Sequence, residues 1–120
     1  MNSMSTTKIP MLENHLKAIA GKTRLSIAFL LTFGELCICD LQKILDLPQT
    51  TISRHMHYMK RNGWVSDQKR GRWIYYRLKP ANDPFHAALI KLVAQELRDH
   101  PAFSDLIRKM QDHKVNRNCI

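Results

Sequence analysis

The sequence predicts a mainly α-helical domain that carries one small β-hairpin, and three observations support this prediction. Apolar residues recur at helical spacing in several short segments, which Gly and Pro residues separate. Two of these segments are joined by a turn at Pro48, which disfavours helical geometry in the residue before it. Two strand-like runs, 64–69 and 72–78, follow and meet at Arg70-Gly71. A helix-turn-helix followed by such a hairpin is a winged helix-turn-helix.

The helices can be assigned from their apolar spacing and from the residues that end them. In the segment 49–62, Ile52, Met56 and Met59 recur at i, i+4 and i+7 and would pack against the preceding helix. Farther along, Asp83 is a good helix N-cap, and the proline after it suits the first turn. We expect helices over 11–20, 22–33, 40–46 and 49–62, one from Asp83-Pro84 onward, and a last one carrying Phe103, Leu106, Ile107 and Met110.

One hundred and twenty residues are enough for a single domain with a modest core. We expect a flexible arm over 1–10, a winged helix-turn-helix domain with terminal dimerisation helices over 11–113, and a flexible tail over 114–120. A domain this small cannot bury all of its terminal apolar stripes, so we expect a homodimer. The sequence has no apolar run of membrane-spanning length and no export signal at its start, which predicts a cytoplasmic protein with no membrane partner.

Positive charge is concentrated in the helix-turn-helix and the hairpin. The chain carries a net charge of +9, and the segment 54–79 holds eight Lys and Arg residues against one acidic residue. Such a cluster, interleaved with Trp and Tyr, predicts a polyanionic partner, here double-stranded DNA. The polar side of the helix over 49–62 supplies candidates for base edges, and the hairpin supplies candidates for phosphates. These DNA-binding candidates are Gln49, Thr50, Ser53, Arg54 and His57 in the helix, and Lys69, Arg70 and Arg72 in the hairpin.

Two of the three cysteines, Cys37 and Cys39, lie directly before the first helix of the helix-turn-helix. Side chains two residues apart on a regular α-helix point about 200° apart, so both sulfurs can bind one ion only where the backbone is extended or distorted. Thiolates suit soft, thiophilic ions. Binding of such an ion would strain the DNA-binding unit, which would make this segment a switch. The alternative is that both cysteines are small buried hydrophobic residues.

Several segments, in this order, resemble one known family: Ala20–Leu25, Glu35–Leu41, Leu47–Met56, Gly63–Val65 and Gly71–Leu78. Together they resemble the arsenical-resistance repressors, the ArsR type within the ArsR/SmtB family of winged-helix metalloregulators. The resemblance runs from about residue 13 to 79 and more loosely to 98. It implies a homodimer that binds operator DNA when metal-free and is released when trivalent arsenic or antimony binds. It also implies Cys37 and Cys39 as the metal ligands, and no organic cofactor.

The ligand set departs from the family in one respect, because Gln42 occupies the position where some members carry a third cysteine. Either two thiolates are sufficient, or Cys119 supplies the third, in its own chain or across the dimer. The related zinc sensors use Asp-x-His and a later His pair on the last long helix. Here Asp99 and His100 are adjacent and His113 does not fall at the right spacing, so we expect no zinc site of that kind.

The sequence leaves two other functions open and speaks against a third. A repressor of the same fold could sense oxidants or reactive sulfur, which requires Cys119 as a partner because a disulfide between cysteines two apart is strained. A constitutive architectural DNA binder would show no ligand response. An enzyme is not expected, because the sequence has no Cys-x-x-Cys, no His-Glu-x-x-His and no glycine-rich phosphate loop. The operator, and the choice among arsenite, antimonite and methylated arsenicals, are left open.

Overall fold

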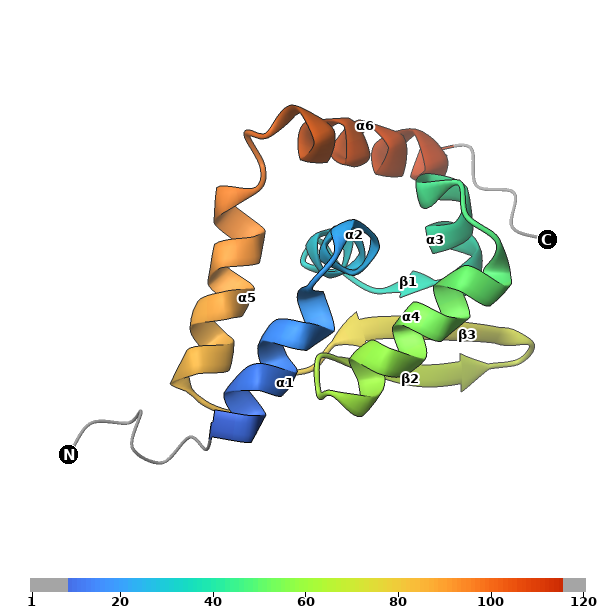
Figure 1. Ribbon diagram of the computed structural model, residues 1–120. Coiled ribbons are helices and arrows are strands. Elements are labelled where there is room, and N and C mark those ends of the chain that lie inside the picture. The colour runs from blue at the N-terminus through green and yellow to red at the C-terminus, as the bar shows by residue number, and fades with distance from the viewer. Residues whose placement is uncertain (1–8, 116–120) are drawn as a thin grey trace.

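The computed structural model describes residues 9–115 as a mainly α-helical domain with one small sheet (Figure 1). Helix-turn-helix and hairpin follow each other as expected, so the predicted winged helix-turn-helix is confirmed. In chain order the elements are α1 (Ile9–Ile19), α2 (Lys22–Leu31), β1 (Leu36–Cys37), α3 (Ile38–Leu45), α4 (Gln49–Arg61), β2 (Val65–Arg70), β3 (Trp73–Leu78), α5 (Pro84–Glu96) and α6 (Pro101–Val115).

Helix α2 forms the centre of the core. Residues Ile27, Phe29 and Leu30 have no exposed surface, and the helix is apolar on nearly every side. Such a helix must be covered on all sides by other elements. Figure 1 shows α2 end-on, enclosed by the other helices and the sheet. The bulky Trp64 closes this core from the α4 side and donates its indole N–H to the carbonyl oxygen of His15 at 3.0 Å.

The sheet is antiparallel, with strand order β1-β3-β2. Strand β2 pairs with β3 up to the Arg70–Trp73 pair, so the turn is Gly71-Arg72, one residue later than expected. Gly71 has φ of 62°, a left-handed conformation that glycine adopts without strain and that tight hairpin turns require. The two-residue strand β1, which lies directly before α3, was not predicted.

Several helix boundaries differ from the expectation by one or two residues, and the ends of α1, α2, α3 and α4 all come earlier than expected. Helix α3 begins at Ile38 instead of residue 40, because Cys37 already acts as its N-cap. Helix α1 begins at Ile9, inside the expected arm, and α6 continues to Val115, beyond the expected domain end at 113. Across residues 9–115, no helix has both the length and the apolar content that crossing a membrane requires.

Helix α6 packs against its own chain through part of its surface. It crosses α2 and contacts α3, while α5 lies beside α1 and α2 (Figure 1). Its residues Phe103 and Met110 are buried, and the Phe103 ring meets Phe29 edge-on at 5.2 Å. Helix α5, by contrast, leaves Leu92 55% exposed.

A buried pair of imidazole rings joins α1 to α5. His15 and His86 stack with ring centroids 4.3 Å apart, and both are almost completely buried. Asp83 caps α5 as expected, by accepting the backbone N–H of His86 at 2.8 Å, and its other oxygen lies 3.4 Å from Nε2 of His15. Burial is the main cause that lowers the pKa of His86 to about 4, and the neighbouring His15 contributes in the same direction. His86 is therefore neutral at pH 7.

Candidate nucleic-acid interface and thiol site

Helix α4 presents a polar side to solvent because its apolar residues are turned inward. Residues Ile52, Met56 and Met59 have no exposed surface, and the helix packs against α3, α2 and β2. This confirms the predicted inward stripe. The opposite side carries the polar residues singled out in the sequence, of which Ser53 is half-buried and the other four are exposed: Gln49, Thr50, Arg54 and His57.

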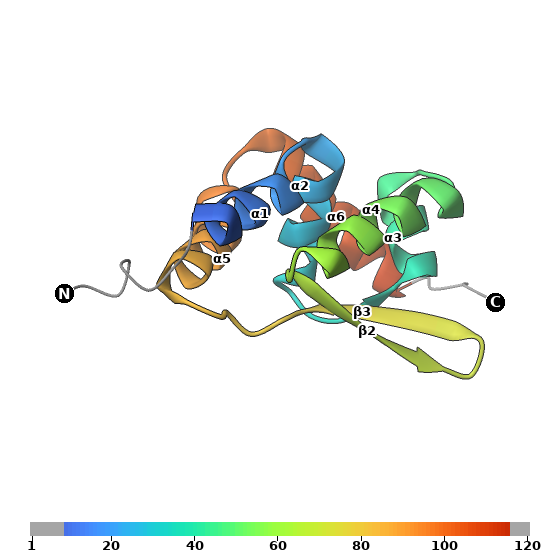
Figure 2. The same ribbon diagram turned by 60° about the horizontal axis from the view of Figure 1, so that its bottom comes forward.

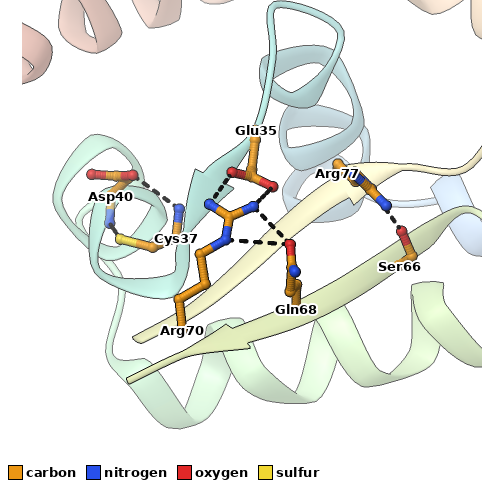
Figure 3. Close-up of polar contacts among 7 residues, drawn as sticks. All are labelled: Glu35, Cys37, Asp40, Ser66, Gln68, Arg70 and Arg77. Atoms are coloured by element: carbon orange, nitrogen blue, oxygen red, sulfur yellow. Dashed lines mark hydrogen bonds and ion pairs between the residues drawn. The ribbon is translucent and has the colours of Figure 1, made fainter. Parts of the chain in front are cut away.

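The hairpin β2–β3 projects from the helical body on the side of α4 (Figure 2). Lys69 and Arg72 are exposed near its turn. Arg70 is engaged within the chain: its Nη1 and Nη2 donate to the Glu35 carboxylate at 2.6 and 2.8 Å (Figure 3). Its guanidinium also lies 4.5 Å from the centre of the Tyr75 ring. Of the three predicted hairpin residues, Arg70 is therefore held by an ion pair to the loop before β1.

Cys37 is the N-cap residue of α3. Its backbone is extended, with φ of −86° and ψ of 165°. Its Sγ accepts the backbone N–H of Asp40 at 3.4 Å, and Oδ2 of Asp40 accepts the backbone N–H of Cys37 at 2.9 Å (Figure 3). This reciprocal pair is a capping box, which satisfies two N–H groups at the start of a helix.

The electrostatic environment of Cys37 keeps its thiol protonated. Only 5% of the residue is exposed. Burial raises the pKa of this thiol above its ordinary value, and the hydrogen bond to and charge of the Asp40 side chain raise it further. The backbone N–H of Asp40 acts in the opposite direction but is outweighed. Cys37 is therefore a neutral, hydrogen-bonded thiol at pH 7.

Cys39 lies in the first turn of α3 and is half-buried. It borders a recess of about 230 Å³ between α3, the start of α4 and β3. The backbone changes from extended at Cys37 to helical at Cys39, so the divergence expected for two residues of a regular helix does not apply to this pair. The recess is lined by Ile38, Cys39, Gln42, Gln49, Arg72, Trp73 and Ile74.

The sulfur atoms of Cys37 and Cys39 are the donors that this segment offers to a soft ion; Cys37 is a free thiol, and Cys39 can act as a donor only in its reduced form. Among residues 9–115, no group of three or more His, Cys, Asp or Glu side chains is placed to hold a metal ion. Cys119 lies outside the described residues. Two sulfur donors suit a thiophilic ion of low coordination number, whereas structural zinc takes four donors. His113, which is not expected to be a zinc ligand, contacts Asp40, with its Nε2 2.7 Å from Oδ1.

Sequence reasoning missed the side chains that surround Cys37. The spacing Cys-x-x-Asp could have identified Asp40, because it matches the Ser/Thr-x-x-Glu capping-box pattern with sulfur in place of oxygen. No sequence signal identifies His113 as its partner, since 73 residues separate them. The same holds for Glu35 and Arg70, which are 35 residues apart.

Residues 21–67 match the family described as "Bacterial regulatory protein, arsR family". The arsenical resistance operon repressor of Escherichia coli K12 is 44% identical over 75 residues, which are 62% of this chain and 64% of that protein. The matched part thus spans slightly less than two thirds of that relative. The arsenic resistance transcriptional regulator ArsR2 of Pseudomonas putida KT2440 is 40% identical over 105 residues, which are 87% of this chain and 91% of that protein.

A solved structure is also similar to this chain. The homodimeric winged helix-turn-helix DNA-binding domain of a possible ArsR-family transcriptional regulator from Mycobacterium bovis is similar, with a TM-score of 0.63 and 27% identity. The similarity covers 78% of this chain and 83% of that one. The relatives are transcriptional regulators and not enzymes, in agreement with the expectation from the sequence.

Proposed function

The chain belongs to the arsR family of bacterial regulatory proteins, and we propose that it is a metalloid-responsive repressor of an arsenical-resistance operon. In this proposal it binds operator DNA as a homodimer and leaves the DNA when trivalent arsenic or antimony binds Cys37 and Cys39. The observation that carries the proposal is the position of the Cys37 sulfur, which caps the first helix of the helix-turn-helix.

The DNA-binding part of the proposal rests on the exposed side of α4 and on the hairpin. Thr50, Ser53, Arg54 and His57 lie on the side of α4 away from the core, where a major groove can receive them. Gln49 begins the same helix. Lys69 and Arg72 supply positive charge for phosphates on the neighbouring hairpin, and Arg70 can join them only if it leaves Glu35.

The dimer part rests on apolar residues that the single chain leaves exposed. Met11 and Leu16 on α1 are 42% and 48% exposed, and Leu92 on α5 is 55% exposed. Helices α1 and α5 contact each other (Figure 1), so these exposed apolar residues are carried by neighbouring helices. Packing of these helices against a second copy would remove the residues from water and would place two α4 helices for a palindromic operator.

The chemistry of the proposed site is ligand exchange at trivalent arsenic. In the reduced protein, each thiol of Cys37 and Cys39 would lose its proton as its sulfur replaced a hydroxyl group of arsenous acid, and that proton would leave with the hydroxyl as water. Neither sulfur nor arsenic changes oxidation state. Because burial raises the pKa of Cys37, its proton is present until the ligand displaces it.

The Cys37 segment is joined to both elements that would contact DNA. Cys37 pairs with Tyr75 of β3, and α3 packs against α4. Glu35, two residues before Cys37, holds Arg70 of the hairpin. Loss of an N-cap costs a helix about 1 kcal/mol, and here the first turn that it stabilises lies between the hairpin and α4. Displacement of the Cys37 sulfur would therefore alter the relative placement of the two DNA-binding elements.

The test is operator release. An operator is first selected from a random duplex pool with the reduced, metal-free protein, and its fluorescence anisotropy is then followed during an arsenite titration with a phosphine reductant present. We expect arsenite to release the wild-type protein from the operator. Cys37→Ser and Cys39→Ser should bind the same operator and stay bound when arsenite is added. Operator binding by wild type that arsenite leaves unchanged contradicts the proposal. Release by peroxide alone, without reductant, would instead favour the redox-sensing repressor.

A further inference from the structure

Asp40 is a fully buried carboxylate in the first turn of α3, and both of its oxygens have partners. Oδ2 accepts the backbone N–H of Cys37 at 2.9 Å, and Oδ1 lies 2.7 Å from Nε2 of His113. The Asp40 side chain has no exposed surface. Burial of a carboxylate is costly unless hydrogen bonds compensate it. The position of Asp40 therefore depends on both partners. One is the backbone N–H of Cys37, a proposed ligand, and the other is His113 on a distant helix.

The distant partner lies on α6, outside the surface proposed to contact DNA. Helix α6 passes over α2 and reaches α3 with its C-terminal half (Figure 1). Only 8% of the His113 side chain is exposed, and Met110, one turn earlier, is 4% exposed. The last turns of α6 are thus fixed to the first turn of α3 by a buried polar contact next to apolar packing.

We infer that Asp40 and His113 are positioning residues of the thiol site, which hold Cys37 in its capping position and couple that position to the docking of α6. This inference rests on the proposed function, because it concerns what ion binding at Cys37 does elsewhere in the chain. One cooperative unit consists of Cys37 in its capping position, Asp40 bonded to both partners, and α6 packed against α3. Ion binding at Cys37 then loosens the C-terminal half of α6.

The physical basis is the double use of the Cys37 sulfur. In the capped state this sulfur accepts the backbone N–H of Asp40. When the Cys37 and Cys39 sulfurs bind the same ion, the Cys37 sulfur moves relative to the Asp40 N–H. The capping box then loses the hydrogen bond from the Asp40 N–H to that sulfur. Asp40 then holds Cys37 through the remaining bond only, while its other oxygen still faces His113. Coupling of this kind is reciprocal: if ion binding weakens α6 docking, loss of α6 docking strengthens ion binding.

The experiment compares amide hydrogen exchange and arsenite affinity in the reduced full-length protein. Exchange is followed in peptides from residues 101–115, and bound arsenic is counted after equilibrium ultrafiltration. In wild type, arsenite should speed exchange in the second half of α6 by about fivefold or more and leave α5 unchanged. His113→Ala should show fast exchange without arsenite and should bind arsenite about fivefold or more tightly, because the opposing contact is gone.

Two variants separate this coupling from a merely structural role. His113→Gln places an amide N–H donor near the imidazole position and should restore both wild-type values. Gln111→Ala changes an exposed residue of the same helix and should match wild type throughout. A contact that only stabilises the fold would leave arsenite affinity in His113→Ala equal to wild type or weaker, and this result would overturn the inference.

The remaining outcomes are also decisive. Unchanged α6 exchange in wild type that has bound arsenic overturns the coupling while the proposed function stands. No bound arsenic in wild type removes the proposed function, and the inference with it. If His113→Ala does not fold, two other measurements test the inference. These are the effect of arsenite on α6 exchange in wild type and the arsenite affinity of His113→Gln, which should equal that of wild type.

Discussion

The outer side of α4 and the Cys37 segment are neighbouring regions that differ in burial and in hydrogen bonding. On α4, Arg54 and His57 are exposed and lie on a side of the helix that the fold leaves to solvent. In the Cys37 segment, Cys37 and Asp40 are buried and bonded to each other. Substitutions on α4 should therefore change DNA binding without changing the fold, whereas substitutions around Cys37 should change stability and signalling together.

The largest expected effect is a complete loss of arsenite response in Cys37→Ser with little loss of stability. Serine is a better N-cap than most residues, so its hydroxyl can take over the Asp40 N–H, but it cannot supply a thiolate. Cys37→Ala should lose the response as well and should also lose about 0.5–2 kcal/mol of unfolding free energy. Urea denaturation of both variants measures the difference. Equal stabilities would show that the sulfur does not act as a cap.

Acid should weaken the contact between α1 and α5, which is a third region, apart from the outer side of α4 and from the Cys37 segment. The pKa of His86 is about 4 in the fold against 6.5 for an ordinary histidine, so between these values the unfolded chain binds more protons. Stability should be constant above pH 6.5 and fall as the pH drops toward 4, by about 3 kcal/mol at most. The titratable groups that face His86 are His15 on α1, Asp83 and Lys79.

The measurement is urea denaturation at pH 7.0, 6.0 and 5.0, for wild type and for His86→Gln, which removes the titrating ring. The decrease should be clearly smaller in the variant. A wild-type stability that does not change between pH 7 and 5 would contradict the buried, neutral His86.

Arg54→Ala should weaken operator binding by about 10- to 100-fold, the effect typical of a lost base contact. Its unfolding free energy should stay within about 0.5 kcal/mol of wild type, because the side chain is exposed. Anisotropy titrations with operator and scrambled duplexes give the affinity and show whether specificity falls with it. An operator affinity equal to wild type would remove Arg54 from the DNA surface.

The smallest expected effect concerns the ion pair between Glu35, just before the Cys37 segment, and Arg70 of the hairpin. Glu35→Gln should free Arg70 for a phosphate and tighten operator binding about two- to fivefold, with a steeper salt dependence. Asp67→Asn is the matched control, because Asp67 pairs with Lys60 at 3.0 Å and its removal changes the net charge equally. If both variants tighten binding equally, the effect comes from net charge and not from release of Arg70.

Sequence reasoning predicted the DNA-binding side of this molecule better than the thiol side, for a physical reason. The polar side of α4 and the hairpin are local patterns, and each is readable from periods of 3.6 or 2 residues. The cap at Cys37 is also local and could have been found. The Asp40–His113 and Glu35–Arg70 contacts join residues far apart in the chain, and only the packing of α6 and of the sheet brings them together. The exact turn depends on strand register, and the predicted turn at Arg70-Gly71 is one residue too early because Arg70 pairs with Trp73.

The central claim is that the Cys37 and Cys39 sulfurs together bind trivalent arsenic. Arsenic K-edge X-ray absorption of the reduced protein loaded with one arsenite per chain counts the sulfur neighbours of the ion directly. We predict at least two sulfur neighbours in wild type, and fewer in both Cys37→Ser and Cys39→Ser. An arsenic ion surrounded by oxygen alone in wild type, or a sulfur count that neither substitution changes, would contradict the account.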